Sequence, residues 1–81
     1  MSFSKLIIQK VWDKSSAVRG QNADTHRRDD TGQIIYRDSY GKTSDMGWEI
    51  DHKNPVSKGG TDNLRNLRSL NWKSNRQKSD E

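Results

Sequence analysis

The feature that most constrains the fold is the order of elements imposed by the C-terminal part of the chain. Residues 48–52 read Trp-Glu-Ile-Asp-His, which places two large apolar side chains on one face of a short strand and two carboxylates on the other. A loop over residues 53–63 contains a proline and a Gly-Gly pair, and a second β-prone run follows at residues 67–70. Asn71 is a suitable cap for a helix expected over residues 72–78. The pattern therefore predicts strand, loop, strand and short helix.

The N-terminal region carries a different pattern. Residues 4–14 place five apolar side chains near helical spacing behind Ser4, a capping residue, so a helix is expected. A strand over residues 5–8 is the alternative, because two of its residues are β-branched. Residues 15–31 are polar and without a period, which predicts a loop with room for one helical turn, and residues 33–37 are β-prone. The predicted fold class is α+β, with an N-terminal helix and short strands before the C-terminal segment.

Composition bounds the size of the core. Eighty-one residues suffice for one small domain, so residues 1–81 are expected to form a single domain. Leu, Ile, Val and Phe together number 13, which alone is compatible with disorder. A net charge of only +4 and three tryptophans, each with a large area to bury, favour a folded chain. Because the sequence has no cysteine, neither a disulfide nor a thiolate zinc site can stabilise it.

The charge distribution indicates an anionic partner. The isoelectric point is about 9.6, and the stretch from residue 64 to residue 79 contains five bases and no acid. This stretch is a candidate phosphate-contacting surface, and an ordinary solvated helix face is the alternative. The five candidate nucleic-acid-binding residues are Arg65, Arg68, Lys73, Arg76 and Lys78.

A membrane role is not expected. No apolar stretch approaches the roughly 20 residues that cross a bilayer. The apolar run near the N-terminus is too short for a signal peptide, so a cytoplasmic location is the default expectation.

A candidate site lies where the first C-terminal strand ends. Asp51 and His52 are neighbours, and successive strand side chains point to opposite faces, so they can share a site only where the chain curls. Pro55 favours such a bend. Asn75 falls about one turn into the last helix, on the same face as Asn71. A neutral imidazole can accept a proton at pH 7, and oxygen donors suit Mg²⁺ or Mn²⁺. These residues therefore predict metal-assisted attack on a phosphodiester.

The whole arrangement resembles the HNH endonuclease family, also described as the ββα-metal fold. The resemblance covers about residues 48–80. It rests on the matched positions Asp51-His52, Pro55, Gly59-Gly60, Asp62, Asn66-Leu67, Asn75 and Lys78. It implies a metal-dependent endonuclease that hydrolyses phosphodiester bonds and leaves 5′-phosphate and 3′-hydroxyl ends.

The resemblance also implies roles for individual residues. His52 matches the general base that takes a proton from the attacking water, and Asp51 matches a metal ligand. Asn66 matches the asparagine that orients the histidine and braces the loop, and Asn75 matches a second metal ligand. The implied cofactor is a divalent metal, Mg²⁺ or Mn²⁺, which stabilises charge on the phosphorane and the leaving oxygen.

DNA is the partner that the resemblance implies, and double-stranded DNA is the expected form. Arg76 and Lys78 are the first candidates for phosphate contacts, because they flank Asn75. A basic surface this small is expected to contact mainly the backbone, which predicts weak sequence preference.

One common family feature is missing. Many members carry a cysteine pair just before the last motif residue, as part of a structural zinc site. Asn71 and Ser74 occupy those positions here, so no structural zinc is expected. More of the stability then falls on the apolar residues of the motif, namely Trp48, Leu67, Leu70 and Trp72.

Each assignment has an alternative in which the residue has an ordinary structural or solvated role. His52 alone could be a surface histidine, Asp51 a solvated carboxylate, Asn66 a turn residue and Asn75 an ordinary helix residue. Asp62 is interpreted as a brace of the loop and Glu49 as solvated. At the level of function, the alternatives are a nucleic-acid-binding module with little turnover, or a subunit of a larger phage, toxin or restriction system.

Overall fold

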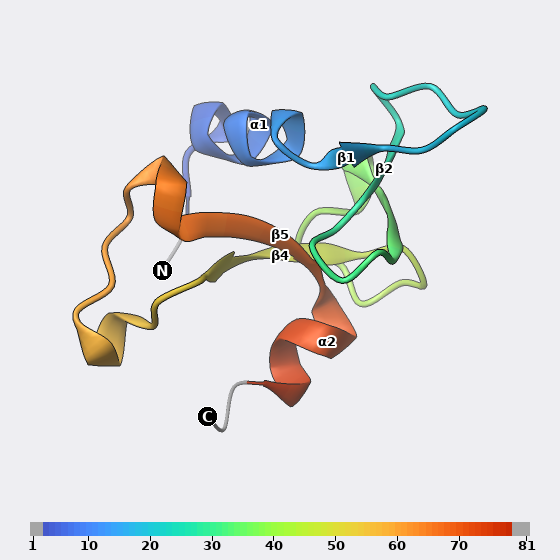
Figure 1. Cartoon of the computed structure of the whole chain (residues 1–81). Helices are drawn as coiled ribbons and strands as arrows, with labels where there is room; N and C mark the ends of the chain where they lie inside the picture. The colour runs from blue at the N-terminus through green and yellow to red at the C-terminus, as the bar shows by residue number, and fades with distance from the viewer. Residues whose placement is uncertain (1–2, 79–81) are drawn as a thin grey trace.

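A computed structural model describes residues 3–78 of the chain. Within them there are two antiparallel sheets and two helices, and the two-stranded sheet lies between the helices (Figure 1). The elements are α1 (Lys5–Asp13), β1 (Ser16–Ala17), β2 (His26–Arg28), β3 (Ile34–Tyr36), β4 (Trp48–His52), β5 (Leu67–Asn71) and α2 (Trp72–Gln77), with 3₁₀ turns at Arg37–Ser39, Val56–Lys58 and Leu64–Asn66. The predicted α+β class is confirmed. Neither helix in this part of the chain has the length and apolarity to cross a bilayer.

Helix α1 forms where the N-terminal apolar spacing predicts it, and the strand alternative for that segment is wrong. Ser4 caps the helix, because its Oγ accepts a hydrogen bond from the Ile7 backbone N–H at 3.2 Å. Val11 and Trp12 are buried where the helix packs against β5. The Trp12 indole also donates to the Ala23 carbonyl, which ties the helix to the loop beyond it.

Residues 15–31 contain two short strands where the sequence predicts only loop, so that prediction is wrong. Strand β2 pairs with β1 on one side and with β3 on the other, both antiparallel. The Arg27 guanidinium fixes the sheet by donating to the carbonyls of Asp13, Ser15 and Ala23. Bonds to distant backbone therefore define these strands, and a period in the local sequence cannot reveal them.

The hairpin of β4 and β5 confirms the predicted strand-loop-strand segment. Its register runs from Trp48 opposite Asn71 to His52 opposite Leu67, so β5 is one residue longer than predicted. Helix α1 packs against β5, and α2 packs against both strands (Figure 1). The core joins these layers and is formed by Val11, Trp12, Ile35, Trp48, Ile50 and Leu67.

The three tryptophans occupy different environments. Trp12 and Trp48 are almost fully buried, with ring centroids 5.6 Å apart. Trp72 is only partly buried, at the start of α2, and its indole donates to the Ser44 carbonyl at 2.7 Å. Two of the three therefore form the core, and the third anchors the edge of α2.

Asp29 joins the N-terminal sheet to α2. One carboxylate oxygen accepts the backbone N–H of Thr31, the Thr31 hydroxyl and the backbone N–H of Gln33, and the other accepts the backbone N–H of Asn71 at 2.7 Å. Asn71 in turn caps α2, because its Oδ1 accepts the Lys73 backbone N–H. The predicted cap is confirmed, and the start of α2 is fixed by the N-terminal region.

Candidate active site

Strand β4 divides its side chains between the core and α2. Trp48 and Ile50 are buried in the core, as the alternation predicts. Glu49 and Asp51 lie on the other face and contact residues of α2 and its C-cap. The strand ends at His52, so this is the point at which neighbouring side chains can turn into one cleft.

Glu49 holds two residues of α2, which corrects the expectation that it is solvated. Its Oε1 accepts a hydrogen bond from Asn75 Nδ2 at 3.0 Å, and its Oε2 is 3.1 Å from a terminal guanidinium nitrogen of Arg76. Only a quarter of its side chain is exposed. Because Nδ2 of Asn75 is turned toward Glu49, the amide oxygen lies on the opposite branch of the same side chain.

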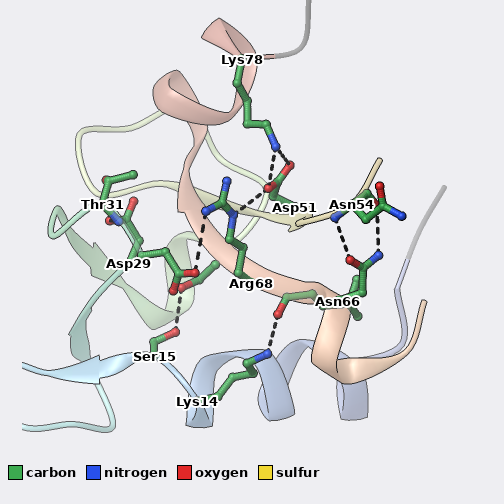
Figure 2. A network of polar contacts seen from close by, with 12 residues as sticks. Lys14, Ser15, Asp29, Thr31, Asp51, Asn54, Asn66, Arg68 and Lys78 are labelled. Atoms are coloured by element: carbon green, nitrogen blue, oxygen red, sulfur yellow. Dashed lines mark hydrogen bonds and ion pairs between the residues drawn. The ribbon is translucent and has the colours of Figure 1, made fainter. Parts of the chain in front are cut away.

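Asp51 is a nearly buried carboxylate held by two cations (Figure 2). Its Oδ2 accepts from Arg68 Nε at 2.8 Å, and Lys78 Nζ lies 3.0 Å from Oδ1 and 2.9 Å from Oδ2. Arg68 lies directly opposite Asp51 in the hairpin register, and its guanidinium is also 3.9 Å from Asp30. These partners offset the cost of removing the carboxylate from water.

His52 is oriented by a second carboxylate. Its Nε2 is 2.6 Å from Oδ1 of Asp62, and its ring centroid lies 5.9 Å from that of Phe3. A carboxylate can only accept, so Nε2 carries the hydrogen and the lone pair of the neutral ring is on Nδ1. His52 is 19% exposed at its side chain. The ring therefore has a fixed tautomer and is largely enclosed.

Asn66 closes the loop between β4 and β5. Its Oδ1 accepts the Asn54 backbone N–H at 2.7 Å, and its Nδ2 donates to the Asn54 carbonyl (Figure 2). The same Nδ2 also donates to the Thr61 carbonyl. Within residues 3–78, none of its hydrogen bonds reaches the His52 ring. Gly60 is required beside it, because a Cβ there would lie 1.8 Å from the Asn54 carbonyl oxygen. Asn66 thus holds the loop by hydrogen bonds to its backbone.

A cleft of about 570 Å³ opens between this loop and α2. It brings together five of the residues singled out from sequence, namely Asp51, His52, Asn75, Arg76 and Lys78. The other four candidates do not line it: Asn66 braces the loop, Arg68 is bound to Asp51, and Arg65 and Lys73 lie elsewhere on the surface. The remaining lining includes Lys53 and Lys58, two cations from the loop.

The electrostatic character of the cleft is positive. Lys53 and Lys58 are exposed, and neither ammonium makes a hydrogen bond or ion pair within the described residues 3–78. Partial burial first, and repulsion from Lys53 second, lower the pKa of Lys14 from its ordinary value, while Asp30 acts in the opposite direction. Lys14 does not line the cleft, and its lowered pKa shows only that Lys53 is near enough to repel it.

The oxygen donors of the cleft suit a hard divalent cation. Asp51 already binds cationic groups through both carboxylate oxygens, and Oδ1 of Asn75 accepts no hydrogen bond within residues 3–78. No group of three or more His, Cys, Asp or Glu side chains gathers anywhere in that part of the chain. Asp51 and Asn75 could supply two oxygen donors, and such a set is compatible with Mg²⁺ or Mn²⁺ because water and phosphate usually complete the coordination of these ions.

The comparison with protein families agrees with this geometry. The family model described as HNH endonuclease matches residues 37–81, which is more than half of the 81-residue chain. The chain therefore belongs to the HNH endonuclease family, whose activity is nuclease-type, whose substrates are nucleic acids and whose members generally use a divalent metal. Comparisons with curated proteins and with solved structures found no match.

The family match begins eleven residues before the segment that carries the sequence resemblance. The added residues include Tyr40, whose ring packs at 4.9 Å from Trp48, and Gly47, whose carbonyl accepts the backbone N–H of Trp72. They precede β4 and support the end of the hairpin where β4 begins and α2 starts.

Sequence reasoning missed the parts played by four residues, two in the cleft lining and two against the His52 ring. Asp62 is more than a loop brace, because it holds the His52 ring, and its position ten residues after the histidine was the available signal. Lys53 and Lys58 precede the acid-free stretch that starts at residue 64, so the charge pattern along the chain does not mark them as phosphate contacts. Phe3 lies far from the motif in sequence, and no local signal could have linked it to His52.

Proposed function

We propose that residues 1–81 form a single small unit that hydrolyses phosphodiester bonds in DNA with the help of a divalent metal. The observation that carries this proposal is the convergence of Asp51, His52 and Asn75 on one cleft. These three residues come from the end of β4 and from the middle of α2, and cationic side chains surround them. A binding protein has no chemical need for this combination.

His52 is proposed as the general base. Its Nδ1 accepts a proton from a water molecule as the water oxygen attacks phosphorus, and the bond to the 3′-oxygen breaks. The leaving 3′-oxygen takes a proton from solvent, which gives 3′-hydroxyl and 5′-phosphate ends. Asp62 stabilises the imidazolium through the hydrogen bond at Nε2, 2.6 Å long. General base catalysis of this kind contributes about 10²–10⁴-fold.

Asp51 and Asn75 are proposed to hold the metal. The Asp51 carboxylate and the Asn75 amide oxygen are the donors, and Glu49 fixes the orientation of the amide. A divalent cation bound there adds positive charge near the phosphate and the leaving oxygen. The hard, all-oxygen donor set supports Mg²⁺ or Mn²⁺ over zinc.

The backbone of double-stranded DNA is the proposed substrate. Lys53 and Lys58 from the loop line the same cleft as Arg76 and Lys78 from α2 and its C-cap, so cations from both walls can contact phosphates. Such contacts carry little sequence information, and weak sequence preference follows.

A plasmid-nicking assay tests the proposal. Wild type is incubated with supercoiled DNA and a series of divalent metals, with EDTA as the metal-free control. We expect nicking with Mg²⁺ or Mn²⁺, no nicking with EDTA, and a loss of about 10²–10⁴-fold in His52→Ala. His26→Ala is the matched control, because His26 contacts Thr25 and Tyr36 and lies outside the cleft.

Two outcomes would count against the enzyme. If folded wild type binds DNA but does not cleave it with any of the divalent metals, the chain is a binding module. If His52→Ala cleaves as fast as wild type, another group performs the base step.

A further inference from the structure

The cleft carries more positive charge than a site that binds a metal cation would favour. Among its lining side chains, one carboxylate, Asp51, stands against four cationic groups, a net formal charge of +3 with His52 neutral. Glu49 pairs with Arg76 behind the lining and leaves the balance positive. A divalent cation that approaches the free protein is therefore repelled by the same residues that attract phosphate.

Lys78 occupies the position where Asp51 would bind a metal. Its ammonium bridges both carboxylate oxygens, at 3.0 and 2.9 Å, as a bound cation does. Arg68 contacts only Oδ2, from the side of the hairpin. Lys78 is thus the group that a metal must displace to reach the open side of the carboxylate.

The two cations on Asp51 differ in how easily they can move. Arg68 is on β5, directly across from Asp51, and it is held there by the hairpin register. Lys78 follows α2 as its C-cap, and its side chain has four rotatable bonds between the helix and the charge. Lys78 can leave the carboxylate without any change in the strands.

We propose that Lys78 is the counter-cation of the metal-free site and that DNA releases it. When a phosphate enters the cleft, the Lys78 ammonium moves to the phosphate, Asp51 becomes available, and the added negative charge favours the metal. This inference rests on the proposed function, because it takes Asp51 as a metal ligand. DNA and metal then bind with positive coupling, and by linkage each raises the affinity for the other by the same factor.

Metal titration provides a readout that does not depend on cleavage. Mn²⁺ binding is followed by electron paramagnetic resonance of the free ion, with wild type alone and with His52→Ala in the presence and absence of duplex DNA, because turnover in this variant is expected to be about 10²–10⁴-fold slower. We expect DNA to tighten Mn²⁺ binding by about 5- to 150-fold, the usual range of coupling between sites.

Lys78→Gln removes the charge and keeps a long polar side chain. In the absence of DNA we expect it to bind Mn²⁺ at least about fivefold more tightly than wild type, and in the His52→Ala background to gain less from DNA. Lys78→Arg restores a cation and should return Mn²⁺ binding to the wild-type level. Lys10→Gln is the matched control, because Lys10 is exposed on α1 and lies outside the cleft, and it should behave as wild type.

The results separate this inference from the proposed function. If wild type nicks DNA with Mn²⁺ but Lys78→Gln binds Mn²⁺ no more tightly than wild type, the counter-cation role is wrong and the nuclease stands. Equal Mn²⁺ affinity with and without DNA also overturns the inference. If wild type neither binds Mn²⁺ in any state nor nicks DNA, both proposals fail.

Discussion

Two buried carboxylates in different regions of the molecule are held in opposite ways. Asp29, in the N-terminal region, is 4% exposed, and its partners are three backbone N–H groups and one hydroxyl. Asp51, in the cleft, is 9% exposed, and its partners are the charged side chains of Arg68 and Lys78. Figure 2 shows both carboxylates in one view, each close to the hairpin of β4 and β5.

The difference separates a structural carboxylate from one that can change partners. Backbone donors belong to the fold and cannot leave Asp29 unless the chain opens. A lysine side chain can leave Asp51 and find water or phosphate, because its charge is at the end of a flexible stem. Burial alone therefore does not distinguish the two carboxylates, whereas the kind of partner does.

The largest expected effect follows the loss of charge at Asp51. Asp51→Asn keeps the shape of the side chain but removes the charge proposed to hold the metal, so cleavage should fall by at least about 100-fold. Arg68 and Lys78 are about a quarter exposed and can reach water, so the free energy of unfolding should fall by about 1 kcal/mol or less. Plasmid nicking and urea unfolding measure the two quantities.

Asp29→Asn should show the reverse pattern. Both carboxylate oxygens of Asp29 accept hydrogen bonds. In asparagine an NH₂ group, which cannot accept, replaces one of these oxygens, so at least one backbone N–H loses its partner in a buried place. We expect the free energy of unfolding to fall by about 2 kcal/mol. Asp24→Asn, at an exposed position, is the control and should change it by less than about 0.5 kcal/mol. If Asp29→Asn unfolds as wild type does, the contrast between the two carboxylates is lost.

A second contrast, between local and distant interactions, explains which elements could be predicted from sequence. The β4 strand, the Asn71 cap and the short α2 helix follow from alternation and capping within a few neighbouring residues, and all three are confirmed. Strands β1 and β2 do not, because Arg27 fixes them by bonds to carbonyls up to fourteen residues away. Local patterns describe elements that are stabilised locally.

The site divides in a similar way. Residue types and spacing identified Asp51, His52 and Asn75, and the structure brings all three to one cleft. The pairing of these residues could not be foreseen: Arg68, expected on phosphate, faces Asp51 because the hairpin register places it there. Register is a property of the folded pair of strands, and a single sequence does not contain it in readable form.

Asp62 offers an intermediate test, since this carboxylate is 54% exposed yet holds the proposed base. Asp62→Asn can still accept the hydrogen bond from Nε2 of His52 but no longer stabilises the imidazolium. Asp62→Ala loses both effects. We expect cleavage to decrease in the order wild type, Asp62→Asn, Asp62→Ala, with a total loss of about 10- to 100-fold. Binding of DNA in EDTA should not weaken in either variant, because a negative charge has been removed. An equal rate in all three proteins would assign Asp62 to the loop alone.

The smallest expected effect concerns positively charged side chains, and it extends the comparison from carboxylates to cations inside and outside the cleft. Lys53 and Lys58 line the cleft without a partner among residues 3–78, whereas Arg65 and Lys73 carry the same charge outside the cleft. In the double variant Lys53→Ala/Lys58→Ala, the slope of log K against log salt for duplex binding in EDTA should decrease by about 2, because each phosphate contact contributes about 0.9. The matched variant Arg65→Ala/Lys73→Ala loses as much charge, so it tests position against net charge. A similar decrease in both variants would mean that DNA responds to the overall charge of the protein and that the two walls of the cleft do not hold it.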